Sequence, residues 1–301
     1  MVEKALGKNY FEIGKLPVHV ARVNRALGES HDHDLTEIPH YHDFTEVIII
    51  LRGNGVHLVE GNEYLVSVGD IFVLQGYQAH SFKDASNIEI VNVMFAPKEI
   101  NKLIDTASIK KIPGYNALFI LEPQYRNKHH FRSILHLNRN ELSRVEYIIN
   151  TMLDEQANME IGYESILKNK LEELIVYLSR EYSKLKSKEA LSLLRIASVI
   201  EYLENNFGKN VSLEDLADIT YMSTRNFQRI FKKATGQSPI DYLIQIRLKK
   251  AKKMLSGSNL QVADIALQVG FNEYNYFSRK FKKAIGVSPI KYRSSFKPVK
   301  E

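Results

Sequence analysis

The sequence predicts an α+β chain of two domains, with a strand-rich N-terminal domain, helices that follow it, and an all-helical C-terminal domain. Three observations lead to this fold class. Short apolar segments separated by turn signals fill residues 17–96, apolar side chains recur at helical spacing over 141–184, and an internal repeat occupies the last third of the chain. A chain of 301 residues is long enough for about two hydrophobic cores.

The first domain, placed at residues 1–140, is expected to consist of short strands. Segments such as EVIIILRGNG and NIEIVNVMF are apolar over the length of a strand, and the turn signals Gly61-Asn62 and Gly69-Asp70 lie between such segments. Glycine-asparagine pairs in these places are typical of β-hairpins. Many short strands at this spacing favour a β-sandwich or a small barrel.

Two helices are expected at residues 141–184. Leu142, Val145 and Ile149 begin one apolar stripe, Leu167 and Leu171 begin another, and NMEIG separates them. These stripes need a partner, which is either the strand domain or a second copy of the chain. The polar stretch LKSKEA at 185–190 is the expected linker to the helical domain at 191–301.

Charge is unevenly distributed along the chain. From Ala190 onward there are 19 Lys+Arg residues against 9 Asp+Glu, whereas the preceding part has 22 against 26. A basic C-terminal domain favours a polyanionic partner. Cysteine is absent, which excludes disulfides and thiolate metal sites. The sequence has neither a signal-peptide pattern nor an apolar run of about 20 residues, so we expect a cytoplasmic protein without a membrane span.

The C-terminal domain contains two copies of one helical unit. The segment DLADITYMSTRNFQRIFKKATGQSPIDY at 215–242 aligns with DIALQVGFNEYNYFSRKFKKAIGVSPIKY at 264–292 after one inserted residue. In each copy a short helix (213–219 or 262–268) precedes a longer one across a tight turn. A helix at 240–255 joins the copies. This is the layout of two helix-turn-helix units, in which the second helix enters the major groove of DNA.

The longer helix of each copy has an apolar face and a polar face. The expected core residues are Phe227, Phe231 and Ala234 in the first copy and Phe277, Phe281 and Ala284 in the second. Residues on the opposite face suit DNA, because arginine pairs with guanine, glutamine and asparagine pair with adenine, and lysine neutralises phosphates. They are Arg225, Gln228, Arg229 and Lys232, then Asn275, Ser278, Arg279 and Lys282. The alternative is a helical protein-binding domain with a solvated basic face.

These motifs resemble the AraC/XylS family of bacterial transcription regulators. The resemblance rests on F-K-K-A-x-G-x-S-P in both copies, with GFNEYNYFSR before the second and PIKYR after it, and it covers about 191–296. It implies seven helices in two helix-turn-helix units, and it adds Tyr276 to the residues expected to contact DNA. The first turn has Tyr221-Met222 where the second has Gly270-Phe271.

The strand domain has a cluster of polar residues in HYHDFTE at 40–46. His40, His42 and Glu46 share parity, so a β-strand would direct all three to one face, and His80 is expected to approach from a neighbouring strand. Three imidazoles and one carboxylate suit Fe(II), Mn(II), Ni(II) or Zn(II). The same four residues suit hydrogen bonding to a small ligand, or to one another, without metal. The spacing leaves both interpretations open.

The spacing H-x-H-x3-E-x6-G, followed by G-x10-H, resembles the two motifs of the cupin barrel. Gln75 departs from the second motif, where a proline is common. Metal-binding cupins have three histidines and one carboxylate as ligands. A cupin fused to this kind of DNA-binding domain implies a sensor of small molecules, often sugars, without catalysis. Asn92, in phase with Ile90 on an apolar strand, and Arg22 are two further candidate effector contacts.

Within the family, PHYHDFTEVIIILRGNGVHLVEGNEY with AHSF, NVMF and LHLN is most similar to the rhamnose-responsive regulators. This implies a monosaccharide effector, led by a 6-deoxyhexose, and a homodimer formed through 141–184. We therefore expect a non-enzymatic activator of a sugar-utilisation operon that works with double-stranded DNA and RNA polymerase. Two alternatives stay open. One is a metal-dependent cupin enzyme, a dioxygenase or sugar isomerase, that carries a DNA-binding domain, and the other is a constitutive DNA-binding protein with a vestigial barrel.

Overall fold

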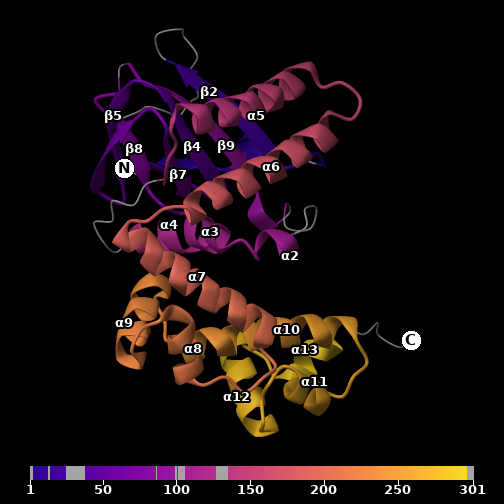
Figure 1. Cartoon of the computed structure of the whole chain (residues 1–301). Coiled ribbons are helices and arrows are strands. Elements are labelled where there is room, and N and C mark those ends of the chain that lie inside the picture. The colour runs from indigo at the N-terminus through magenta and orange to yellow at the C-terminus, as the bar shows by residue number, and fades with distance from the viewer. Residues whose placement is uncertain are drawn as a thin grey trace. The chain divides into compact units, whose positions relative to one another are not determined.

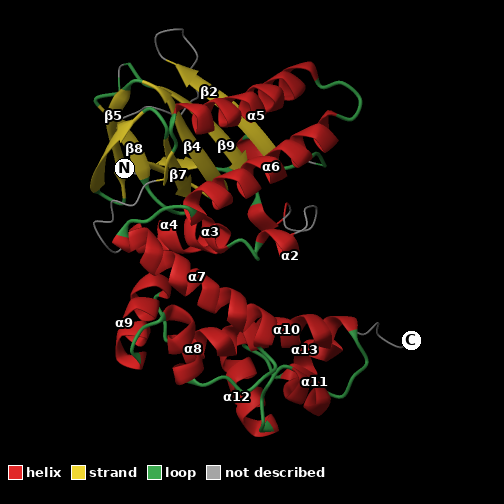
Figure 2. Ribbon diagram, in the orientation of Figure 1, coloured by secondary structure: helices red, strands yellow, loops and turns green. Residues whose placement is uncertain are grey.

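The computed structural model describes residues 3–12, 14–24, 38–85, 87–98, 100, 106–126 and 135–296. The chain divides into two compact units, Met1–Leu194 and Arg195–Glu301. The strands of Figures 1 and 2 all belong to the first unit, and the second unit is helical. The predicted fold class is therefore confirmed. Among the described residues, every helix is too short or too polar to cross a membrane.

The first unit is built on two five-stranded sheets. Sheet I has the strand order β1-β3-β8-β5-β6, and sheet II has the order β10-β7-β4-β9-β2. The strands are β1 (Glu3–Ala5), β2 (Val18–Asn24), β3 (His40–His42), β4 (Thr45–Arg52), β5 (Asn54–Val59), β6 (Asn62–Ser67), β7 (Asp70–Leu74), β8 (His80–Lys83), β9 (Glu89–Phe95) and β10 (Leu135–His136). Strand pairing among the described residues stays within each sheet, so the domain takes the form of a sandwich.

Apolar side chains from both sheets fill the space between them. Ile48, Ile50 and Phe72 of sheet II belong to one buried cluster with Val59 and Phe82 of sheet I. Every residue of β9, an inner strand of sheet II, is buried. Sheet II is therefore covered on both faces, which explains why its strands are almost continuously apolar rather than alternating.

Helices α5 (Arg139–Asn158) and α6 (Tyr163–Ser183) lie across the outer face of sheet II (Figure 1). The side-chain amide of Gln156 on α5 bonds both backbone groups of Val20, at 2.8 and 2.9 Å. These bonds satisfy backbone groups of β2, one of the two edge strands of this sheet. The helical region expected at 141–184 is therefore present, and it packs at least in part on its own domain.

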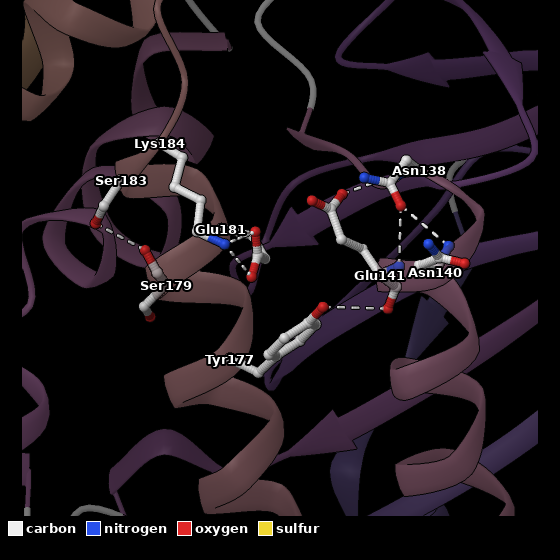
Figure 3. A network of polar contacts seen from close by, with 8 residues as sticks. All are labelled: Asn138, Asn140, Glu141, Tyr177, Ser179, Glu181, Ser183 and Lys184. Atoms are coloured by element: carbon white, nitrogen blue, oxygen red, sulfur yellow. Dashed lines mark hydrogen bonds and ion pairs between the residues drawn. The ribbon is translucent and has the colours of Figure 1, made fainter.

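Short polar contacts fix the ends of α5 and α6 (Figure 3). The Asn138 side chain accepts hydrogen bonds at the start of α5, and the Glu141 carboxylate accepts one from the Asn138 backbone N–H in return. The Tyr177 hydroxyl of α6 donates to the backbone carbonyl of Glu141 at 3.4 Å. Lys184 donates to the Glu181 carboxylate at 2.6 and 2.7 Å just after the end of α6.

The first unit also contains several short helical segments. They are η1 (Gly7–Asn9), α2 (Thr106–Ile109), α3 (Pro113–Tyr115), the π-helical turn η3 (Asn116–Leu121) and α4 (Glu122–Arg126). Helix α3 lies directly on α6, because the Gly114 N–H donates to the Ser183 hydroxyl at 3.0 Å. A Cβ at Gly114 would lie 1.9 Å from the backbone oxygen of Ser179. Only glycine allows this approach.

The linker expected at 185–190 is shorter in the structure. Helix α7 spans Lys188–Asn206, so residues 188–190 form its first turn and only 185–187 lie outside helices. Glu189 and Ala190 are good helix formers, and an acidic residue is favoured in a first turn. The boundary between the two compact units falls within α7.

The second unit contains the two helix-turn-helix pairs expected from the repeat. Its helices after α7 are α8 (Leu213–Thr220), α9 (Thr224–Thr235), α10 (Pro239–Gly257), α11 (Val262–Gln268), α12 (Tyr274–Ile285) and α13 (Pro289–Ser294). Gly236 and Gly286 end α9 and α12 as left-handed caps. The described part of the chain thus has the seven helices that the family resemblance implies.

The turns of the two helix-turn-helix units share one backbone requirement but meet it with different residues. Both need a left-handed backbone, at Tyr221 (φ 53°) and at Gly270 (φ 93°). Tyr221 is 90% exposed, so its side chain has room. A Cβ at Gly270 would lie 2.7 Å from the backbone oxygen of Phe207 and 2.8 Å from the Arg247 guanidinium. Packing therefore requires glycine only in the second turn.

The core of the second unit agrees with the sequence analysis at five of its six positions. Phe227, Phe231 and Ala234 of α9 are buried, as are Phe277 and Phe281 of α12. The sixth position is different: Ala284 is exposed. The second copy ends in the six-residue α13, whereas α9 is followed by the long α10, so less of the domain covers the last turn of α12.

Candidate effector site and DNA-contacting face

The polar residues of HYHDFTE do come together, but from two sheets. Strand β3 ends at His42 in sheet I and β4 begins at Thr45 in sheet II, so the chain crosses the sandwich between them. His40 and His42 therefore meet Glu46 across the interior. The prediction that one strand directs all three to one face was wrong, because the strand is interrupted at Asp43 and Phe44.

The four predicted residues form one buried cluster. The Nε2 atom of His42 lies 3.3 Å from the Oε2 atom of Glu46, and the Nε2 atom of His80 lies 3.4 Å from the same oxygen. His40 is paired with His80 between β3 and β8, and their ring centroids are 4.2 Å apart. All four side chains are buried. Ligand atoms of His42, Glu46 and His80 lie within 4.8 Å of one another, and His40 packs beside them.

A further histidine, His57 on β5, joins this cluster. Its Nε2 lies 3.4 Å from the Nδ1 of His80, and its ring stacks on Phe82 at 4.4 Å between centroids. Burial, followed by the charge of Arg126 and the nearness of His40, lowers the pKa of His57 well below its usual 6.5. Burial and the neighbouring histidines lower the pKa of His80 in the same way. Both rings are therefore neutral at pH 7.

Helix α4 places a buried ion pair next to the histidines. The Arg126 Nε donates to Glu122 Oε1 at 2.9 Å, and its Nη2 contacts the other carboxylate oxygen. The guanidinium lies 4.9 Å from the ring centroid of Phe72 in sheet II and 5.8 Å from that of Tyr64 in sheet I. Arg126 therefore reaches between the two sheets. Burial raises the pKa of Glu122, and the Arg126 charge opposes this shift.

The two additional effector candidates separate in the structure. Asn92 is buried and pairs with Ile48, so it shares the interior face of sheet II with the core. Arg22 pairs with Val91, the neighbour of Asn92, so its side chain points to the opposite face of sheet II. Its guanidinium donates to Asn150 of α5 at 2.9 Å, on the outer face of the sheet. Strand parity therefore directs Arg22 away from the interior, where the histidine cluster lies.

A cavity of about 410 Å³ lies beside the histidine cluster, within the first unit. Its wall includes Asp43, Phe44, Thr45, Gln75, Tyr77, Phe95, Tyr115, Phe119 and Ile175. The Phe44 ring also stacks on the His42 ring at 4.3 Å, so Phe44 is shared by the cavity and the cluster. Ile175 belongs to α6. Aromatic walls with a few hydroxyl, amide and carboxylate groups are typical of small-molecule sites.

Gln75, which departs from the cupin motif, has a specific contact here. Its side-chain N–H donates to the backbone oxygen of Phe119 at 2.6 Å. Gln78 donates in the same way to the backbone oxygen of Pro123 at 3.0 Å. A proline at position 75 could not make the first bond. These two amides attach the loop after β7 to η3, which lines the cavity, and to α4, which follows η3.

The eight predicted DNA contacts all lie on exposed surface of the second unit. They are Arg225, Gln228, Arg229 and Lys232 on α9, and Asn275, Tyr276, Arg279 and Lys282 on α12. The Arg229 guanidinium donates to Asn226 Oδ1 at 2.8 Å, which orients it along the helix surface. The Lys280 ammonium lies 5.5 Å from the Tyr276 ring centroid. Both helices thus present an equivalent polar face opposite their phenylalanines.

Two family models match the chain. An AraC-like ligand binding domain matches residues 23–145, and a helix-turn-helix domain matches residues 216–295. The two matches together span more than half of the chain and coincide with the sandwich and the repeated helical unit. The chain belongs to the AraC family. The resemblance inferred from its motifs is confirmed, and this AraC-family chain is a transcription regulator with a DNA-binding and a ligand-binding domain.

Its curated relatives include transcriptional activators. The chain is 28% identical over 240 residues to the HTH-type transcriptional activator RhaS of Enterobacter sp. (strain 638), covering 79% of this chain and 81% of the relative. It is 27% identical over 238 residues to RhaS of Escherichia coli O1:K1 / APEC, with the same shares of both chains covered.

Solved structures also resemble this AraC-family chain. The C-terminal domain of AraT, a response regulator from Geobacillus stearothermophilus, is 33% identical, with a TM-score of 0.33, over 36% of this chain and 88% of that one. ToxT from Vibrio cholerae is 14% identical, with a TM-score of 0.36, over 92% of this chain and 97% of that one.

Proposed function

We propose that the chain activates transcription in response to a monosaccharide, led by a 6-deoxyhexose, that binds in the N-terminal sandwich. The observation that carries this proposal is the matched pair of exposed polar faces on α9 and α12 in a chain that also encloses a small-molecule cavity. The relatives that are named transcriptional activators support activation as the sign of regulation. Cytoplasmic location and contact with RNA polymerase follow from this role.

The effector is placed in the cavity bounded by Phe44, Thr45 and Tyr115, next to the histidine cluster. This location is favoured over the interior of the cluster because the cluster is closely packed, whereas the cavity of about 410 Å³ has room for a small molecule. Aromatic rings pack against the apolar faces of a sugar, and the hydroxyl and carboxylate groups accept or donate to its hydroxyls. His40, His42, His80 and Asn92 then support the wall from behind.

Helix α6 carries the signal in this proposal. Ile175 of α6 lines the cavity, and Gly114 and Ser183 hold the cavity segment α3 against the same helix. A ligand that binds one arrangement of α3 and α6 more tightly than another shifts the population between them. Because α6 is followed after a few residues by α7, such a shift is transmitted along the chain to the DNA-binding helices.

Dimerisation through the 141–184 helices is proposed as well. Tyr147, Ile161 and Ile166 of this region are exposed although they are large and apolar. Two copies joined there supply four recognition helices, two for each half-site of an operator. Light scattering of the purified chain measures the molar mass directly.

The DNA-binding roles are tested by Arg229→Ala and Arg279→Ala. Each variant removes a bidentate base contact from one recognition helix, so operator affinity is expected to fall by about 10- to 100-fold per arginine. Footprinting on the operator measures the loss. Arg195→Ala, which removes an exposed arginine of α7, is the matched control and should bind normally. Normal footprints from either recognition-helix variant would remove that helix from the groove.

The effector assignment is tested by a thermal-shift screen of monosaccharides with and without divalent metal. A ligand at 100 times its Kd stabilises the folded chain by about 2.7 kcal/mol, which raises Tm measurably. Tyr115→Phe, which removes one hydroxyl from the cavity, should reduce the shift, and Tyr147→Phe on exposed α5 should not.

Two rival functions predict different results in this screen. A constitutive DNA-binding protein with a vestigial sandwich shows no shift with any sugar. A cupin enzyme with a DNA-binding domain consumes its sugar or oxidises a substrate in the presence of metal, which product analysis by mass spectrometry detects. Sugar binding without turnover supports the sensor.

A further inference from the structure

Three buried ligand atoms converge where the two sheets face each other. The Nε2 atoms of His42 and His80 lie 3.3 and 3.4 Å from the Glu46 Oε2. None of these three atoms has a hydrogen bond within the described structure, although each is inaccessible to solvent. Buried polar atoms without partners are rare, because each costs about 1–3 kcal/mol of desolvation. Their convergence on one point needs a physical cause.

The proton positions on His42 leave a lone pair at this point. Its Nδ1 lies 2.8 Å from the backbone oxygen of Phe44, and a carbonyl oxygen accepts hydrogen bonds but cannot donate. The Nδ1 therefore carries the proton, and in the neutral ring Nε2 is the unprotonated atom. A nitrogen lone pair and a carboxylate oxygen would then face each other at 3.3 Å and repel, unless a cation lies between them.

His57 supplies the matching support for His80. The Nδ1 of His80 lies 3.4 Å from His57 Nε2, and the tautomer in which His80 Nδ1–H donates to His57 leaves the His80 Nε2 lone pair directed at Glu46. A metal-bound histidine commonly donates its other ring N–H to a neighbouring acceptor, which fixes its orientation. Both histidines thus have their second nitrogen occupied outside the point of convergence.

The distances also suit a metal ion. Ligand atoms about 2.1 Å from a tetrahedral zinc ion lie about 3.4 Å from one another, whereas a direct N–H to oxygen hydrogen bond is usually about 2.9 Å long. The two separations in the cluster are 3.3 and 3.4 Å. Two imidazoles and one carboxylate are ligands that divalent transition metals accept, and three protein ligands leave at least one coordination position open.

We propose that His42, Glu46 and His80 bind one divalent transition-metal ion, with His57 as the residue that positions His80. The ion links β3 and β8 of sheet I to β4 of sheet II, and so holds the sandwich closed behind the cavity wall at Phe44. His40, counted among the ligands in the sequence analysis, packs on the His80 ring instead. The rival arrangement is a protonated His42 paired with the Glu46 carboxylate, in which a proton takes the place of the metal.

The test uses the full chain without a histidine tag, stripped with a chelator and dialysed. Isothermal titration with Zn²⁺ and metal analysis after desalting should give one ion per chain. The absence of cysteine removes thiolate competition. Co²⁺ should give the visible absorption of a four- or five-coordinate site with nitrogen and oxygen ligands, and this readout needs no variant. A wild-type chain that retains no Zn²⁺ and gives only the spectrum of hydrated Co²⁺ would overturn the proposal.

Variants locate the site. Glu46→Gln and His80→Gln keep the approximate side-chain volume and should weaken Zn²⁺ binding by more than about 100-fold, while His57→Gln should weaken it by about 10- to 100-fold. His136→Gln is the matched control, because His136 also pairs with a carboxylate, that of Asp70 at 2.8 Å, but on the surface. Unchanged binding in Glu46→Gln and His80→Gln, or loss in His136→Gln, would contradict the assignment. Calorimetry of the full chain checks that the first unit of each variant is folded. Metal binding is measured without any sugar, so its outcome is independent of the proposed effector.

Discussion

Arg126→Met is expected to destabilise the first unit by about 3–5 kcal/mol, one of the two largest effects predicted for this chain. The substitution leaves the Glu122 carboxylate buried without its partner, and the charge cannot be reached by water. It also removes the guanidinium from the rings of Phe72 and Tyr64. Calorimetry of the full chain measures the loss as a fall in the Tm of the first unit.

The stability of the Arg126→Met variant is expected to fall as pH rises. Burial raises the pKa of Glu122 in the folded chain, and Arg126 opposes that shift, so removing Arg126 raises the folded-state pKa further. A carboxyl group with a raised folded pKa binds more protons in the folded state than in the unfolded state. The variant should therefore be most stable at acidic pH, below the unfolded pKa, and should lose stability as pH rises through the folded pKa.

A double variant separates the buried charge from lost packing. Replacing both partners, as Glu122→Leu with Arg126→Met, removes the charge as well as its counterion, so most of the stability should return and the new pH dependence should vanish. If the double variant were as unstable as Arg126→Met, shape and not charge would be the cause. If Arg126→Met alone were as stable as the parent chain, the ion pair would not be buried as the structure has it.

Gly114→Ala is the second substitution with a large expected effect. The new methyl group would overlap the backbone oxygen of Ser179 at 1.9 Å, and a helix backbone cannot give way as a side chain does. We expect α3 to move off α6 and the first unit to lose more than about 3 kcal/mol, above the usual range for overpacking. The hydrogen bond from Gly114 to Ser183, whose place on α6 Figure 3 shows, is lost at the same time.

Gly257→Ala is the matched control for this prediction. Gly257 ends α10, and a Cβ there would meet nothing within 4 Å. Alanine should be neutral or slightly stabilising at that position, because it restricts the unfolded chain. Calorimetry and the sugar thermal shift are measured on both variants. A Gly114→Ala chain with unchanged Tm would show that α3 and α6 are not in close contact, and would weaken the proposed path from cavity to helix.

The DNA-binding unit could be predicted from sequence almost residue by residue, for a physical reason. The signals are local: helix periodicity, a glycine that ends a helix at Gly236, and a Ser-Pro pair that begins one at Ser238. Each of them occurs in both copies of the repeat. The exception, Ala284, depends on what lies beside the last turn of α12 and not on the turn itself. Local patterns determine helices, whereas they do not determine which part of a helix is covered.

The candidate site was predicted less well because its contacts are between sheets. His40, His42, Glu46 and His80 were found by spacing, yet the crossing between His42 and Thr45 was not expected. His57 was missed because its strand, NGVHLV, is apolar at both parities and does not reveal an inward face. Glu122 and Arg126 have the i, i+4 spacing of an ordinary surface ion pair, and only the fold shows that they are buried.

The first strand has a consequence for how the sandwich folds. Strand β1 has only three residues and pairs in parallel with β3, matching Glu3 with His40. The chain between β1 and β3 must close into a long loop, and three residue pairs offset little of the entropy that this closure costs. We therefore expect this pairing to form late in folding and to open before the other strand pairs. Because β3 carries His40 and His42, local opening there exposes the histidines while the rest of the sandwich stays folded. An ion bound at the cluster, as proposed above, would therefore exchange without unfolding of the sandwich.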